Sequence, residues 1–408
     1  YLSKREGRNR VSIAGSFSDE DILERNIFLN FPCPDFVARQ DFYHEIVRFL
    51  APAQEANTFI LVEGPVGSGK SRLLKELFGY QEALAFYNAC SEIDSLVPYR
   101  SIILFINSLA ESNNPVLAEA CGELAKDLLL EINRIVPNIS KFIPSYNNFS
   151  YQGTGQNRKL LFDALVMLLN ILSQKKPLLL LFDESQNIDH ATLLVIEALT
   201  EQEKGCSVIV ASIRDDYLNI SQSANEVFNQ FLSTISERQN YKRFSLPLFN
   251  NEQTAEIVST IFSRKFSDPA FYDKIHQVTR GNPLFIEELL KHFLLKDFIK
   301  RLNKQWILDL PSIPPAVWQK DMDTIIAENI DLLEAETKTV IKQATVMGQN
   351  ISLDVLRDVA HQNEGETIDA IDKAKRLNII KSTEPLKTDQ FTFTTKHFQE
   401  IVYQNIDE

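Results

Sequence analysis

The stretch that decides the fold is Gly64-Pro65-Val66-Gly67-Ser68-Gly69-Lys70-Ser71-Arg72, which follows the apolar run Phe59 to Val62. A strand must turn sharply into a helix here, and glycine allows the left-handed backbone that such a turn requires. Successive backbone N–H groups then point at an anion on the helix N-terminus. The pattern predicts a phosphate-binding loop (P-loop) in which Gly64 to Arg72 contact a nucleotide, Lys70 reaches its β- and γ-phosphates and Ser71 binds Mg²⁺.

The composition is ordinary for a folded protein of more than one core. The 408 residues are 44% hydrophobic and 24% charged, and domains usually hold far fewer residues than this chain. Lys and Arg number 42 against 55 Asp and Glu, so the net charge of −13 opposes binding to nucleic acid. No stretch is long and apolar enough to span a membrane and the start lacks a signal-peptide pattern, so we expect a cytoplasmic protein. The four cysteines are too scattered for a zinc site or a disulfide framework.

A second apolar run, Leu178 to Phe182, ends in the acidic pair Asp183-Glu184. Continuous apolar runs are typical of parallel strands covered on both faces, and open α/β sheets bind ligands beyond the carboxyl ends of such strands. Asp183 is therefore predicted to hold Mg²⁺, directly or through water. Glu184 is predicted to orient or deprotonate the water that attacks the γ-phosphate. The alternative is an acidic N-cap for the following helix.

The run from Cys206 to Ser212 predicts a further strand, which ends at Ile213-Arg214. If this strand is the parallel neighbour of the P-loop strand, Arg214 lies beside the phosphate site and can sense the γ-phosphate. The alternative is an ion pair with Asp215 or Asp216. The pattern also predicts a strand at residues 84–89, a helical insertion at 99–135 and a helix at 158–172. The fold class is α/β, with a parallel sheet covered by helices on both faces.

Changes of pattern divide the chain into four segments. Residues 1–32 turn from basic to acidic and are predicted to be a linker, and residues 33–245 hold the nucleotide-binding sheet. The pattern of residues 246–310 predicts a series of short helices. After a hinge at Pro311, Pro314 and Pro315, residues 311–408 alternate helices with a closing pair of strands near Ile379 and Phe391, which is the pattern of a winged helix.

This ordered set of motifs resembles the STAND class of P-loop ATPases, the signal-transduction relatives of the AAA+ proteins, over about residues 36–406. Phe36-Val37-Ala38-Arg39 is similar to the family's entry motif, with Ala38 in place of the usual glycine. The segment Asp183 to Asp189 is similar to its strand-end signature, with Asn187 where a tryptophan is common. Arg214 matches the family's sensor position.

The resemblance continues beyond the sheet. Gly281-Asn282-Pro283 matches the lid motif, which implies that residues 246–310 form a helical lid and that Pro283 lies near adenine. Ala344 to Gly348 and Phe393 to Tyr403 match the family's winged helix. Many relatives place a histidine where this chain has Thr395, and in some of them that histidine contacts the β-phosphate of ADP. His397 or Lys396 could supply this contact instead, and the alternative is that His397 and Thr395 only cap and solvate the helix.

More narrowly, the order of segments is similar to the ATPase region that follows the tandem catalytic domains of soluble class III adenylyl cyclases. Tyr1 to Gly7 would correspond to the exit from the second cyclase domain, and no cyclase domain lies within these residues. The resemblance implies a segment of a longer signalling protein. Its partner would be an attached or neighbouring output domain, such as a nucleotide cyclase.

The leading hypothesis is a regulatory ATPase switch that binds ATP or ADP with Mg²⁺ and hydrolyses ATP slowly, with Glu184, Lys70 and Arg214 as catalytic residues. One alternative is a DNA-binding initiator whose winged helix reads a groove. The candidate recognition helix, Thr367 to Leu377, mixes acidic with basic residues, which argues against that reading. A second alternative is a scaffold that holds ATP unhydrolysed. The sequence leaves the oligomeric state open.

Overall fold

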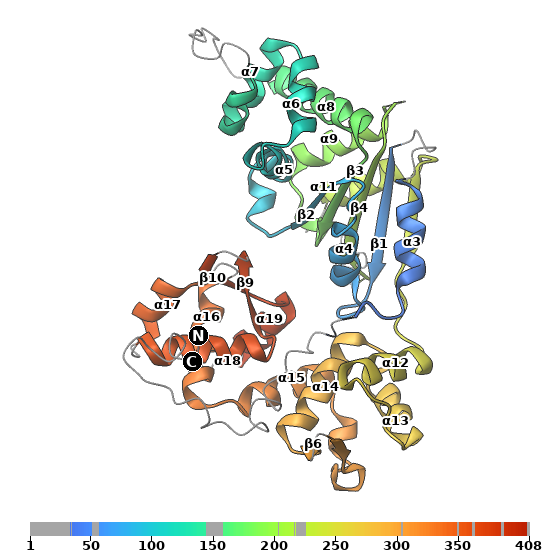
Figure 1. The fold of residues 1–408 in the computed structure, drawn as a ribbon, viewed down its shortest axis with the longest axis vertical. Coiled ribbons are helices and arrows are strands. Elements are labelled where there is room, and N and C mark those ends of the chain that lie inside the picture. Colours follow the sequence, from blue (N-terminus) through green and yellow to red (C-terminus); the bar gives the residue numbers. More distant parts are fainter. Residues whose placement is uncertain are drawn as a thin grey trace. The chain divides into compact units, whose positions relative to one another are not determined.

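The computed structural model describes residues 33, 35–50, 57–143, 158–202, 204–215, 217, 226–302, 305–348, 351–360, 364–384 and 387–405. The predicted linker, residues 1–32, lies outside this part of the chain. The chain forms two compact units (Figure 1). We call the described part of Arg39–Pro247 the sheet unit, and that of Tyr1–Ala38 and Leu248–Glu408 the helical unit.

A five-stranded parallel sheet forms the centre of the sheet unit, in the order β2-β3-β4-β1-β5 (Figure 1). Its strands are β1 (Thr58–Gly64), β2 (Leu84–Ala89), β3 (Leu178–Asp183), β4 (Ser207–Arg214) and β5 (Tyr241–Ser245). The four strands predicted from the sequence are confirmed. β5 lacks the apolar run that predicts the others, because it lies at an edge of the sheet and exposes Lys242 and Arg243.

Helices cover both faces of the sheet, as predicted. The described helices of this unit are α3 (Gln40–Arg48), α4 (Lys70–Phe78), α5 (Arg100–Glu111), α6 (Pro115–Glu123), α7 (Lys126–Ile135), α8 (Arg158–Lys175), α9 (His190–Thr200) and α11 (Glu226–Ser236), with 3₁₀ turns η2 (Asp94–Leu96), η3 (Pro137–Phe142) and η5 (Ser185–Asn187). Of these, α6 and α7 pack on α8. Every residue of β3 is buried. Leu178, Leu180 and Phe182 join the core formed with α8, α9 and α11. Leu179 and Leu181 point to the opposite face, where α4 packs on β1 to β4.

The helical unit contains two apolar cores that follow one another along the chain. The first involves α12 (Asn251–Phe262), α13 (Pro269–Thr279), α14 (Pro283–Leu295), β6 (Ile299–Leu302), β7 (Gln305–Leu308), η6 (Leu310–Ser312), η7 (Val317–Gln319) and α15 (Met322–Asp331). Cys33 and Val37, which the predicted boundary at residue 33 assigns to the sheet, pack in this core. The cores meet on α15, where Ile325 joins the first and Ile326 the second.

The second core follows the proline-rich hinge. Its elements are α16 (Ala335–Met347), β8 (Ile351–Ser352), α17 (Leu353–Ala360), α18 (Glu364–Arg376), β9 (Ile380–Glu384), β10 (Lys387–Phe393) and α19 (Lys396–Gln404). The predicted closing pair of strands is confirmed as β9 and β10, which pair antiparallel, and the two-residue β8 adds a third strand beside β10. The assignment of this part as a winged helix, and of α12 to α14 as a lid, stays a prediction.

Candidate functional site

The turn between β1 and α4 has the backbone that its glycines require. Gly67 and Gly69 have φ of +78° and +98°, and Gly69 lies immediately before the first residue of α4. A side chain at either position would be strained. At Gly64 a Cβ atom would lie 2.9 Å from the carbonyl oxygen of Leu246 and 2.9 Å from Ser68 Oγ. The loop therefore folds tightly over the start of α4, as predicted for a P-loop.

Lys70 and Ser68 are buried in this loop. The Lys70 ammonium donates to the carbonyl oxygens of Gly64 (2.7 Å) and Pro65 (2.9 Å). Ser68 Oγ is buried and has no hydrogen-bond partner among the described residues. A buried hydroxyl without a partner is costly, and phosphate oxygens would supply the acceptors that both side chains can use. Ser71, the predicted Mg²⁺ ligand, is exposed in the first turn of α4.

Arg39 supports the loop from outside the motif. Its guanidinium donates to the carbonyl oxygen of Ser68 (3.3 Å) and to that of Pro247. The side chain is only 4% exposed, and burial lowers the pKa of Arg39 to about 10. The entry motif thus places a buried cation against the backbone of the P-loop. The sequence indicates the entry motif but does not predict the contact between Arg39 and the P-loop backbone.

Asp183 ends β3 with both carboxylate oxygens hydrogen-bonded. Oδ1 accepts from the hydroxyl of Ser212 on β4, and Oδ2 accepts from the hydroxyl of Tyr87 on β2 (3.0 Å). Burial raises the pKa of Tyr87 well above its ordinary value, and the neighbouring charge of Asp183 raises it further. The phenol therefore keeps the proton that it donates. Neither Tyr87 nor Ser212 is predicted from the sequence, although Ser212 interrupts an apolar run at a strand end.

Glu184 occupies a left-handed turn, with φ and ψ both 51°. Its backbone N–H donates to Ser212 Oγ (3.2 Å), and the Ser185 hydroxyl donates to the Ser212 carbonyl (2.8 Å). Asp189, not the acidic pair, caps α9 by accepting from the Thr192 N–H (2.9 Å). Glu184 takes the N-cap position of η5 but makes no side-chain capping hydrogen bond there. The turn instead leaves the half-buried Glu184 side chain at the end of β3.

Arg214 ends β4 directly opposite Gly64 in the parallel register of β1 and β4. The strand that ends at Arg214 is therefore the parallel neighbour of the P-loop strand, as its predicted position beside the P-loop requires. Its guanidinium lies 5.1 Å from the centre of the Tyr217 ring. Of the two acidic residues weighed as ion-pair partners, Asp216 lies outside the described residues. The choice between a sensor and an ion pair stays a prediction.

The sheet order brings the predicted residues of this unit together. β3, β4 and β1 are adjacent and parallel, so their carboxyl ends meet at one edge of the sheet. That edge carries Asp183 and Glu184 after β3, Arg214 at the end of β4 and the P-loop after β1.

Pro283 lies in the helical unit, where Gly281-Asn282-Pro283 forms a capped turn. A Cβ atom at Gly281 would fall 1.8 Å from the Phe249 carbonyl oxygen, and the Phe249 N–H donates to the Gly281 carbonyl (2.8 Å). Asn282 caps α14 by accepting from the backbone N–H groups of Leu284 and Phe285, and Pro283 is the first residue of the helix. These contacts account for the motif structurally, and the predicted approach of Pro283 to adenine stays a prediction.

His397, near the C-terminal end of the chain, contacts an acidic residue of α15. β10 ends at Phe393, and Thr395 caps α19 by accepting from the Phe398 N–H (3.2 Å). His397 Nε2 lies 2.9 Å from Asp323 Oδ1 on α15. Both contacts favour the reading in which Thr395 and His397 cap and solvate the helix.

The residues of the sheet edge suit ATP and Mg²⁺ chemically. Mg²⁺ prefers oxygen ligands and is usually held by one or two side chains together with phosphates. Ser71 and Asp183 offer a hydroxyl and a carboxylate, and the loop supplies backbone N–H groups, a buried hydroxyl and a lysine for phosphate. The donor set therefore fits the predicted cofactors.

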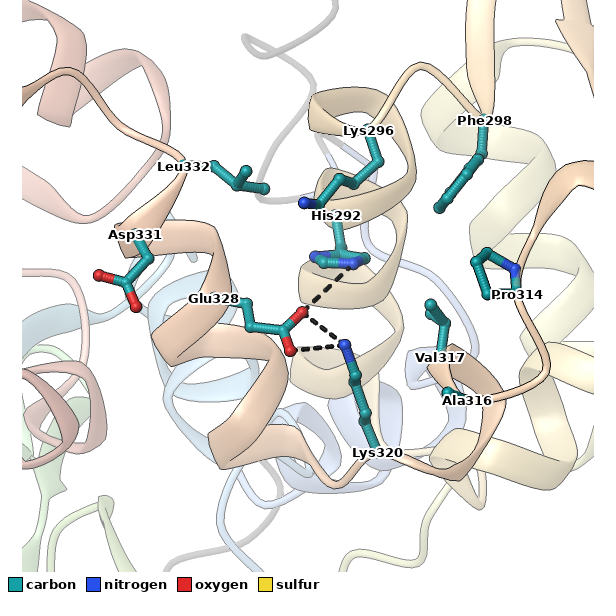
Figure 2. Close-up of a pocket in the computed structure, with 10 residues that line it drawn as sticks. All are labelled: His292, Lys296, Phe298, Pro314, Ala316, Val317, Lys320, Glu328, Asp331 and Leu332. Carbon is teal, nitrogen blue, oxygen red and sulfur yellow. Dashed lines mark hydrogen bonds and ion pairs between the residues drawn. The ribbon is translucent and has the colours of Figure 1, made fainter.

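Other kinds of site find little support in the described residues. No group of three His, Cys, Asp or Glu side chains there could hold a metal ion, and the four cysteines are buried and unbridged. No described helix is both long and apolar enough to cross a membrane. A cavity of about 390 Å³ in the helical unit (Figure 2) contains no predicted site residue; it lies beside His292, whose pKa is lowered chiefly by burial.

Comparison with known proteins agrees with this geometry. Residues 35–210 match the family model of the AAA ATPase domain. The chain is similar to a signal transduction ATPase with numerous domains (STAND) with a tetratricopeptide repeat sensor from Pyrococcus horikoshii, with a TM-score of 0.52, 13% identity and coverage of 92% of this chain and 43% of that one. It also aligns with a Walker-type ATPase of Pyrococcus abyssi, with a TM-score of 0.43, 13% identity and coverage of 91% and 97%. No curated protein matches.

These findings show a P-loop ATPase-like module with the fold of the STAND type. The matched stretch contains the P-loop, Asp183 and Glu184. The chain spans less than half of the P. horikoshii protein, and at 13% identity the likeness concerns the fold alone. The resemblance to STAND ATPases is confirmed at that level, and the link to adenylyl cyclases stays a prediction.

Proposed function

We propose that this chain is a regulatory switch that binds Mg-ATP, hydrolyses it slowly and controls an output domain of a larger signalling protein. The observation that carries the proposal is the meeting of the P-loop, the Asp183-Glu184 pair and Arg214 at the ends of three adjacent strands. A phosphate cradle alone would support binding. An acidic pair and an arginine beside the cradle supply what hydrolysis needs in addition.

Each residue then has a distinct role. Lys70 and the loop N–H groups bind the β- and γ-phosphates, and Ser71 and Asp183 hold Mg²⁺, which when bound neutralises phosphate charge. Glu184 orients the attacking water or accepts its proton. Arg214 senses the γ-phosphate.

A switch also needs two arrangements that nucleotide stabilises unequally. In the proposal, α12 to α14 form the lid with Pro283 near adenine, and the residues after about 311 form a winged helix that reports the nucleotide state. The output domain is of the nucleotide cyclase kind, as in the soluble adenylyl cyclases that the order of segments resembles. The net charge of −13 disfavours the alternative of a DNA-binding initiator.

The test measures which nucleotide the protein holds and whether it turns over. We expect mass spectrometry of purified chain to find adenine nucleotide, phosphate release to be slow but above that of Lys70→Ala, and protease digestion patterns to differ between ADP and a non-hydrolysable ATP analogue. ATP retained with turnover no faster than in Lys70→Ala would favour the scaffold. Identical digestion patterns would reject the switch, and a salt-resistant, sequence-selective shift of duplex DNA would favour the initiator.

A further inference from the structure

The Asp183 carboxylate is held from two neighbouring strands at once. Tyr87 on β2 donates to Oδ2 (3.0 Å), and Ser212 on β4 donates to Oδ1. A carboxylate with one donor on each oxygen cannot rotate about its Cβ–Cγ bond without losing both bonds. Each oxygen retains a further lone pair, so Asp183 can still accept a metal ion or its water. The two hydroxyls thus fix the direction in which Asp183 presents its charge.

The Tyr87 side chain has contacts at both its hydroxyl and its ring. Its half-buried phenol lies beside the Asp183 carboxylate. The ring also lies 6.3 Å from that of Phe78, at the last residue of α4. The ring therefore packs beside the last residue of the helix that begins at the P-loop.

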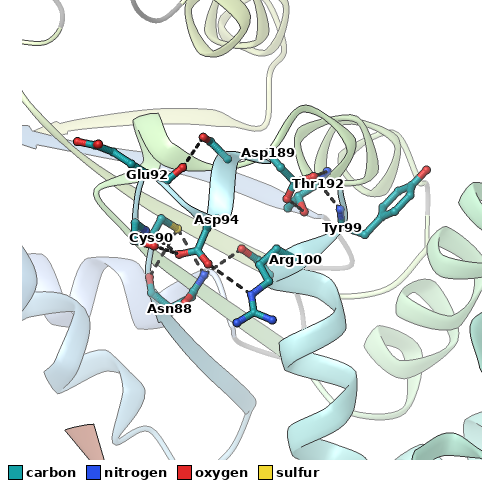
Figure 3. A network of polar contacts seen from close by, with 11 residues as sticks. Asn88, Cys90, Glu92, Asp94, Tyr99, Arg100, Asp189 and Thr192 are labelled. Atoms are coloured by element: carbon teal, nitrogen blue, oxygen red, sulfur yellow. Dashed lines mark hydrogen bonds and ion pairs between the residues drawn. The ribbon is translucent and has the colours of Figure 1, made fainter. Parts of the chain in front are cut away.

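The strand that carries Tyr87 is anchored just beyond it. The Cys90 N–H donates to the Asp183 carbonyl oxygen (2.9 Å). In the following loop (Figure 3), Asp94 accepts from the backbone N–H and hydroxyl of Ser91 (2.7 and 2.8 Å), and the Tyr99 N–H donates to Asp189 Oδ1 (2.8 Å). The Cys90 bond ties the residue after β2 to the end of β3, and the Tyr99 bond ties the residue before α5 to the start of α9. The Cys90 bond and the parallel register of β2 and β3 place Tyr87 next to Asp183.

We propose that Tyr87 is a positioning residue that, together with Ser212, orients Asp183 for Mg²⁺. The inference rests on the proposed function, because it concerns the metal ion of that same site. Hydrogen-bond partners of metal-binding carboxylates typically account for about 10- to 100-fold in metal affinity. Tyr87 is not predicted from the sequence, where it is only one aromatic residue of a strand.

The test measures the Mg²⁺ concentration that half-saturates binding of a fluorescent ATP analogue. Tyr87→Phe removes one hydroxyl and keeps the packed ring, and we expect the midpoint to rise about 10-fold. Nucleotide affinity in excess EDTA should be unchanged, because the hydroxyl acts through the metal. Tyr241→Phe, on the opposite edge strand, is the matched control and should leave the midpoint as in wild type. Ser212→Ala removes the donor at the other oxygen and should raise the midpoint too.

The outcomes separate the inference from the function on which it rests. If Tyr87→Phe lowers only the melting temperature and leaves the Mg²⁺ midpoint unchanged, Tyr87 is part of the core and the inference is wrong, while the proposed function stands. The inference is also wrong if Tyr87→Phe weakens nucleotide binding in excess EDTA as much as it weakens binding in the presence of Mg²⁺. If wild-type protein binds no Mg-ATP, both the inference and the proposed function fail.

Discussion

Glu184→Gln should keep ATP bound and slow its hydrolysis by about 10²- to 10⁴-fold, the usual contribution of a general base. At 1.36 kcal/mol for each tenfold change, this corresponds to about 2.7 to 5.4 kcal/mol of activation free energy. Gln preserves the shape of the side chain but cannot accept a proton at neutral pH. The structure predicts little effect on folding, because the Glu184 backbone N–H that donates to Ser212 is retained and the side chain is only half-buried.

The assay is single-turnover phosphate release with protein in excess over ATP, combined with a titration of nucleotide affinity. Glu201→Gln, which changes an exposed carboxylate of the same unit, is the matched control and should behave as wild type. Turnover within twofold of wild type in Glu184→Gln, with ATP still bound, would refute the assignment. Glu184 would then serve only to shape the turn after β3.

Three further predictions concern the helical unit. Gly281→Ala should destabilise it by about 3 kcal/mol or more in denaturant unfolding, because the new Cβ would meet the Phe249 carbonyl. The control is Gly122→Ala on α6 of the sheet unit, where an added Cβ would meet no neighbouring atom within 4 Å and should be tolerated. Burial lowers the pKa of His292, so the folded protein binds a proton there less readily than the unfolded chain does. The contribution of neutral His292 to stability is therefore present above the ordinary histidine pKa and is lost as the pH falls. The free energy of unfolding, measured from about pH 7.5 to 5, should show a decrease that His292→Gln lacks. His397→Ala should change ADP affinity less than about fivefold, and a tenfold loss by calorimetry would show that an imidazole contacts the phosphate.

Much of the sheet was predictable because its strands carry continuous apolar runs or end in distinctive motifs. The P-loop glycines and the Asp183-Glu184 pair each mark a strand end, and adjacency of β1 and β4 then places Arg214. β5 escapes such reasoning because an edge strand exposes its charged side chains. The hairpin of β6 and β7 and the two-residue β8 are too short and too polar to produce a pattern.

The contacts that orient the site were less predictable than its motifs. Tyr87, Ser212 and Arg39 act through hydrogen bonds to residues 96, 29 and 29 positions away in sequence. Nothing in their local sequence specifies those partners, since they depend on strand order and register. A sequence motif indicates the residues predicted to contact the ligand. The residues that orient those side chains can be identified only from the folded structure.

The central claim, that Gly64 to Arg72 bind nucleotide phosphate, is tested most directly by calorimetric titration of Lys70→Ala with Mg-ATP. The two carbonyl oxygens to which Lys70 donates belong to its own loop, so its loss should leave the protein folded, with a melting temperature at or somewhat below that of wild type. Lys75→Ala, at an exposed lysine of the same helix α4, is the matched control and should bind normally. The account predicts an affinity at least about 100-fold weaker for Lys70→Ala, a loss of about 2.7 kcal/mol. Equal ATP affinity in Lys70→Ala and wild type would contradict it.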